Sequence, residues 1–94
     1  MITTTERKML DAIETKVNWK RGNTEVVYHP NANYSAVYLY NNLIAWHLHA
    51  AAETIVSRET LANHPTRTTK SRLRAMGVDV MTNMGITYLD GEAV

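Results

Sequence analysis

The fold of this chain is decided by residues 34–49, which read Tyr-Ser-Ala-Val-Tyr-Leu-Tyr-Asn-Asn-Leu-Ile-Ala-Trp-His-Leu-His. Two runs rich in β-forming residues flank the pair Asn41-Asn42. Asparagine tolerates the positive φ that a two-residue type I′ turn requires. The segment therefore predicts a β-hairpin with strands over residues 34–40 and 43–49 and its turn at Asn41-Asn42.

The two faces of this hairpin differ in character, because side chains in a strand alternate between faces. With Tyr40 opposite Leu43, the predicted core face carries Val37, Leu39, Ile44, Trp46 and Leu48. The other face carries Tyr34, Tyr38, Tyr40, His47 and His49. Tyrosine is enriched at protein interfaces, so these last five residues form a candidate partner-binding surface. A covering N-terminal helix would instead make this face a second core layer, and the sequence leaves both interpretations open.

The flanking segments predict two helices and further strands. Thr3 and Glu6 form a capping-box pattern before an apolar stripe, which predicts a helix over residues 6–17. A strand is expected over 24–29, a short one over 53–57, a basic helix over 68–76 that ends at Gly77, and a closing hairpin of 78–81 with 86–89.

The organisation is that of one α+β domain with an antiparallel sheet. The 94 residues contain no internal repeat and no low-complexity tract. We expect a single domain over residues 1–94, in which 1–22 form the N-terminal helix and a linker and 23–91 form the core.

Positive charge is concentrated in residues 66–76, although the whole chain has a net charge of only +1. This segment holds Arg67, Lys70, Arg72 and Arg74 and no acidic residue. On a helix, Arg67, Lys70 and Arg74 share one face, which makes the four residues a candidate site for an anion or a nucleic acid. A solvated amphipathic helix explains the same pattern.

Motifs for catalysis and for cofactors are missing from the sequence. The chain has no cysteine, which excludes thiol catalysis and cysteine-based zinc sites, and it has no Gly-rich phosphate loop. His47 and His49 are spaced like two metal ligands on one strand face, but nothing specifies a third ligand, and a solvated sheet face explains them better. We therefore expect a non-enzyme without metal or cofactor.

Three ordered motifs resemble those of a family of small, mostly uncharacterised bacteriophage proteins. They are the hairpin Val-Tyr-Leu-Tyr-Asn-Asn-Leu-Ile-Ala at 37–45, the helix Thr-Arg-Thr-Thr-Lys-Ser-Arg-Leu-Arg-Ala-Met-Gly at 66–77, and Gly-Ile-Thr-Tyr-Leu-Asp-Gly at 85–91. The chain departs from the family pattern at Asn41, which replaces a turn glycine, at Arg74, which replaces an asparagine, and at Thr87, which replaces an aromatic residue.

The resemblance implies a phage protein, and small phage proteins commonly bind and redirect a host protein. We therefore expect a non-catalytic accessory protein that binds and modulates or inhibits a host protein, in host takeover or anti-defence, in the host-cell cytoplasm. The alternative is a nucleic-acid-binding protein that uses helix 66–76. No signal peptide or membrane span is expected. A homodimer through an edge strand or the tyrosine face is compatible with the sequence.

Overall fold

A computed structural model describes residues 2–94 of the chain. The elements follow one another as α1 (Thr4–Thr15), β1 (Trp19–Arg21), β2 (Thr24–His29), β3 (Tyr34–Leu39), β4 (Asn42–Leu48), β5 (Glu53–Val56), α2 (Arg58–Asn63), α3 (Arg67–Ala75), β6 (Val80–Asn83), β7 (Ile86–Leu89) and β8 (Glu92–Ala93). This arrangement confirms the predicted α+β class.

Helix α1 begins at the predicted capping box. The Glu6 N–H donates to the Thr3 hydroxyl and the Thr3 N–H donates to the Glu6 carboxylate, both over 3.1 Å. These bonds satisfy two backbone donors that the first turn of a helix leaves free. The helix ends at Lys16, whose φ of 58° is left-handed.

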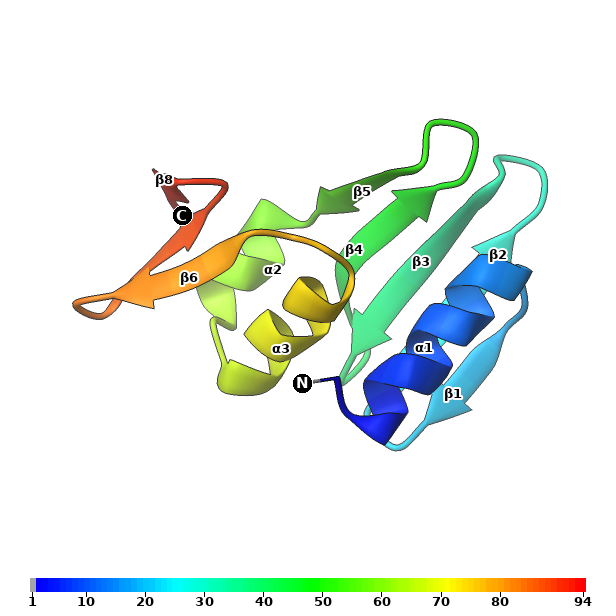
Figure 1. The fold of residues 1–94 in the computed structure, drawn as a ribbon, viewed down its shortest axis with the longest axis horizontal. Helices are drawn as coiled ribbons and strands as arrows, with labels where there is room; N and C mark the ends of the chain where they lie inside the picture. The colour runs from blue at the N-terminus through cyan, green and yellow to red at the C-terminus, as the bar shows by residue number, and fades with distance from the viewer. Residues whose placement is uncertain (1) are drawn as a thin grey trace.

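The main sheet has five antiparallel strands in the order β1-β2-β3-β4-β5. Helix α1 lies across one of its faces, and α2 and α3 lie beside it at one end (Figure 1). A single buried cluster joins the helices to this face, and it includes Met9 and Ile13 of α1, Val26 and Val37 of the sheet, and Leu73 of α3. Strand β1 was not predicted, because Gly22 and its polar neighbours read as a linker.

The turn of the central hairpin lies one residue earlier than the sequence predicts. Tyr40 and Asn41 form it, with φ values of 51° and 65°, and Leu39 pairs with Asn42. The pairing then shifts between Val37 and Tyr38, which leaves Ile44 as the extra residue of a β-bulge.

This shift decides which side chains of β4 face the helices. A one-residue slip in register moves side chains to the opposite face of a sheet. The expected core positions of Val37, Leu39 and Ile44 are confirmed, since all three are buried in the cluster. The expected core positions of Trp46 and Leu48 are wrong, because both lie on the opposite face, beside Ala36 and Tyr34.

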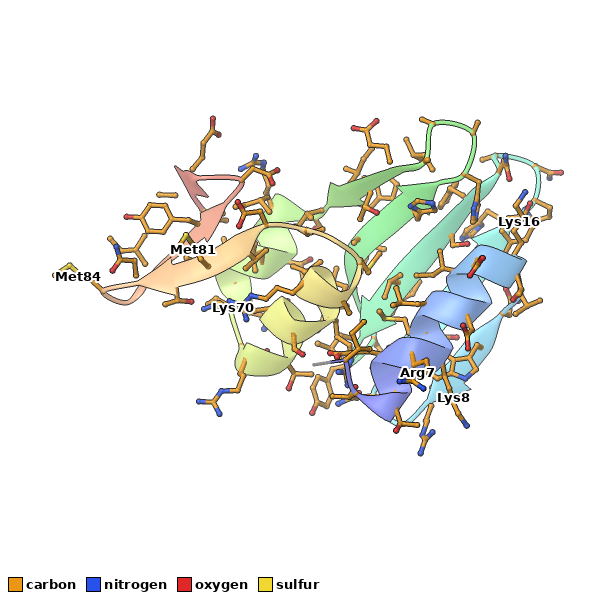
Figure 2. All side chains as sticks on the ribbon, viewed as in Figure 1. Arg7, Lys8, Lys16, Lys70, Met81 and Met84 are labelled. Carbon is orange, nitrogen blue, oxygen red and sulfur yellow. The ribbon has the colours of Figure 1, made fainter. Side chains whose placement is uncertain are left out.

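The C-terminal part of the chain forms a second sheet, in the order β6-β7-β8. The predicted closing hairpin is confirmed, with β8 added to it, although its first strand covers Val80–Asn83 and not residues 78–81. Val80 and Leu89 are buried against the helices, whereas Met81 and Met84 are exposed. This sheet extends away from the main sheet, with Met84 at its far tip (Figures 1 and 2).

Within residues 2–94, no helix is both long enough and apolar enough to cross a membrane.

Candidate functional site

On the face of the main sheet that points away from α1, the part that β3 and β4 supply is apolar, and Lys20, Glu25, His29 and Glu53 of the neighbouring strands border it. We call this apolar part the open face, and it consists of Tyr34, Ala36, Tyr38, Leu43, Trp46 and Leu48. These residues come from β3 and β4 alone and pair directly across the two strands. Together with Ala32 they line a shallow hollow of about 490 Å³.

None of the open-face residues belongs to the buried cluster that joins the helices to the sheet. Tyr34, Tyr38, Leu43, Trp46 and Leu48 are each partly exposed. The solvent face of an antiparallel sheet usually carries polar side chains, so a contiguous apolar face is unusual there. Exposed apolar patches with a polar rim are typical of interaction surfaces and of ligand-binding grooves.

The predicted partner-binding residues divide into three groups. Tyr34 and Tyr38 lie on the open face, as the predicted tyrosine surface requires. Tyr40 lies in the hairpin turn with 66 % of its surface exposed, away from the other tyrosines of the set. His47 and His49 lie on the face that α1 covers, so the prediction that they share a surface with the tyrosines is wrong.

The two histidines form a polar cluster at one end of the covered face. His49 Nε2 lies 2.8 Å from the Ser35 hydroxyl, and His47 Nδ1 lies 3.2 Å from the Thr54 hydroxyl. The His47 and His49 rings meet edge to face, with centroids 5.0 Å apart, and Tyr28 contacts His49 in the same way at 5.6 Å. These contacts fix the orientation of both rings, which are partly exposed.

Burial lowers the pKa of His49, and the nearby His47 and Lys16 lower it further. Loss of hydration penalises the protonated ring, and neighbouring positive charges repel it. The cluster therefore favours a neutral His49. Among residues 2–94, no three histidine, aspartate or glutamate side chains gather as a set of metal ligands.

Sequence reasoning missed the part of the open face that β4 supplies, Leu43, Trp46 and Leu48. The adjacent apolar residues Leu43 and Ile44 were an available signal. In a regular strand such neighbours face opposite sides, whereas a bulge at Ile44 changes the alternation beyond it.

One member of the predicted basic site is buried. Arg72 is 9 % exposed, and its Nη1 donates to Glu6 Oε2 over 2.7 Å while its Nε donates to the Thr24 hydroxyl over 3.1 Å. The Ser71 hydroxyl donates to the same Glu6 oxygen over 2.6 Å. Placing Arg72 on an exposed basic surface is therefore wrong, since its guanidinium joins α3 to α1 and β2.

The other three basic residues of α3 remain at the surface, in different settings. Arg74 Nε donates to the Val80 carbonyl over 2.8 Å, and Lys70 donates to the Thr82 hydroxyl on β6. Figure 2 shows Lys70 on α3 beside β6. Arg67, in the first turn of α3, is exposed and makes no side-chain hydrogen bond within residues 2–94. Two of the three side chains thus attach α3 to the small sheet.

Comparison with known proteins identifies a family. The model of the family described as Kyanoviridae Gp96 protein matches residues 2–93. No curated protein matches the chain, and no solved structure matches it.

Proposed function

We propose that this chain, which belongs to the Kyanoviridae Gp96 family of bacteriophage proteins, is a non-catalytic accessory protein. It binds a host protein in the host-cell cytoplasm and modulates or inhibits that protein, without a cofactor. The open face of the main sheet makes the contact.

The observation that carries this proposal is the composition of the open face. Tyr34, Tyr38 and Trp46 supply three aromatic side chains next to Leu43 and Leu48, around one hollow. Tyrosine and tryptophan dominate the binding energy of many interfaces, because they bury a large area at a small cost in conformational entropy. Lysine and arginine are absent from the lining of the hollow, and Lys20 at the border of this face lies opposite Glu25, which favours a protein over a nucleic acid.

Affinity capture tests the class of partner. The tagged protein is incubated with a lysate of host cells, with and without nuclease, and the bound proteins are identified by mass spectrometry. We expect one host protein at a stoichiometric level in both samples. Recovery that disappears with nuclease would replace this proposal with nucleic-acid binding through Arg67, Lys70 and Arg74. An empty capture would contradict both.

A further inference from the structure

The two edges of the main sheet differ in how they are protected. A free strand edge exposes unpaired backbone N–H and C=O groups, and proteins usually block it with lysines, prolines or very short strands. Strand β1 follows this rule, since it has three residues and carries Lys20 and Arg21. Strand β5 reads Glu-Thr-Ile-Val and has neither lysine nor proline. It forms the other border of the sheet (Figure 1).

The backbone groups that β5 leaves free follow from its pairing with β4. The Ser57 N–H donates to the Ile44 carbonyl over 2.9 Å, and Ile55 lies opposite Trp46. In an antiparallel pair, alternate residues direct their backbone groups toward the partner strand. Ser57 and Ile55 therefore face β4, and the N–H and C=O groups of Thr54 and Val56 point away from the sheet.

A groove of about 530 Å³ runs along this free side. β5 forms one wall, and Met76, Gly77, Val78, Leu89 and Asp90 form the other. The chain enters β5 through three alanines at positions 50–52, so no large side chain stands at that end. Four extended residues span about 13 Å, which sets the length of strand that β5 can pair.

The charges around the groove favour a basic ligand. Glu53 and Asp90 both line it. Arg58 also lines it, but its guanidinium lies 3.9 Å from the Glu92 carboxylate. The lining thus carries two acidic side chains and one basic side chain that is paired with Glu92, and Val56, Val78 and Leu89 supply apolar surface.

We propose that the free edge of β5 binds an extended peptide segment of a partner protein, which pairs with Thr54 and Val56 as a sixth strand. The segment carries apolar residues at alternate positions and a lysine or arginine that faces Glu53 and Asp90. Addition of a strand to a sheet edge is an established mode of peptide recognition. Because the groove has a second wall opposite β5, it accommodates a single chain better than the whole sheet of a second copy.

This site adjoins the open face, since Ile55 lies opposite Trp46, but it uses the backbone edge of β5 and not the side chains of β3 and β4, so each proposal can fail alone. The test uses a displayed library of random dodecapeptides as the probe, selected on the full-length protein. Selected peptides are synthesised, and their binding is followed by amide NMR and hydrogen exchange. We expect alternating apolar residues with lysine or arginine in the selected peptides, and slowed exchange at the Thr54 and Val56 amides.

Two variants sharpen the test. Thr54→Pro removes an outward N–H and leaves the backbone bonds to β4 in place, and should weaken the selected peptides by about tenfold or more. It also removes the hydroxyl that contacts His47, so Thr54→Val, which removes only the hydroxyl, is its control and should bind as the wild type does. Glu53→Lys should weaken them several-fold, whereas Glu14→Lys, the same charge change on α1, should not. A library that yields no binder would overturn the proposal. Peptides that perturb Trp46 but leave Thr54 and Val56 unchanged would overturn it too, while supporting the open face.

Discussion

The carboxylate of Glu6 in α1 receives a hydrogen bond of 2.7 Å from the guanidinium of Arg72 in α3, across 66 positions of sequence. Glu6 is 1 % exposed. Burial by itself would raise the pKa of Glu6, but hydrogen bonds from Ser71, Thr3 and Arg72, with the charge of Arg72, outweigh it and leave the pKa lowered. This pair joins the N-terminal helix to the rest of the domain.

Removing one partner of this pair should be strongly destabilising. Glu6→Gln or Arg72→Met leaves a buried group without its counter-charge or its bonds, and each should lower the free energy of unfolding by about 3–5 kcal/mol. The double variant leaves no unpaired charge, so its loss should fall short of the sum of the single losses by at least about 1 kcal/mol. Urea unfolding measures all three.

The control is the exposed pair Arg58–Glu92, with atoms 3.9 Å apart. Glu92→Gln should change the free energy of unfolding by less than about 1 kcal/mol. Strict additivity of the Glu6 and Arg72 substitutions would show that the two side chains do not act as a pair.

The lowered pKa of His49 predicts a loss of stability in mild acid. Its folded-state pKa lies below the free value, so the unfolded chain binds this proton more readily. The contribution of His49 to the free energy of unfolding is therefore fully present above about pH 6.5. It declines as the pH falls through that value toward the pKa of His49 in the folded protein. Urea unfolding at neutral pH and in mild acid should show this decline, and His49→Gln should reduce it.

His64→Gln, at an exposed histidine outside the cluster, is the matched control for this measurement. A decline in His49→Gln as steep as in the wild type would contradict the assignment to His49.

The hairpin turn predicts a stabilising substitution. Tyr40 has a φ of 51°, a left-handed conformation that asparagine tolerates better than an aromatic residue. Tyr40→Asn should raise the free energy of unfolding by about 0.5–1 kcal/mol. Thermal unfolding checks this. A lower melting temperature would instead show that contacts of the Tyr40 ring outweigh the backbone strain.

Local signals in the sequence predicted most of the elements but not how β4 faces the core. Two of these signals are the capping box at Thr3 and Glu6 and the alternation of side chains in β3. Both depend only on residues close in sequence, so the sequence predicts them. The position of the turn could not be predicted in this way, because two overlapping pairs, Tyr40-Asn41 and Asn41-Asn42, can form it. Asparagine favours such turns more than tyrosine does, yet the chain uses Tyr40-Asn41. The bulge at Ile44 could not be predicted either, and it is the bulge that puts Trp46 on the open face and His47 on the covered face.

Long-range pairing was beyond the reach of the sequence for a different reason. Helical spacing sets Arg72 apart from the stripe of Arg67, Lys70 and Arg74, but only the packing of α1 on α3 gives Arg72 its buried partner Glu6. The groove beside β5 likewise depends on how residues 76–78 and 89–90 return to the main sheet. The spacing of residues along the chain does not predict that these segments lie beside β5.

The most direct test of the account compares two matched variants in the affinity capture. Tyr34→Ser with Leu48→Thr removes a cross-strand pair from the open face. Met81→Ser with Tyr88→Ser removes a comparable pair, again one aromatic and one flexible apolar residue, from the second sheet. Urea unfolding first establishes that both proteins are folded.

We predict that the open-face variant recovers about tenfold less of the host protein than the wild type does, because tyrosine and tryptophan side chains at the centre of an interface supply much of its binding energy. The variant of the second sheet should recover the wild-type amount. Undiminished recovery by a folded open-face variant would contradict the central claim that this face binds the partner.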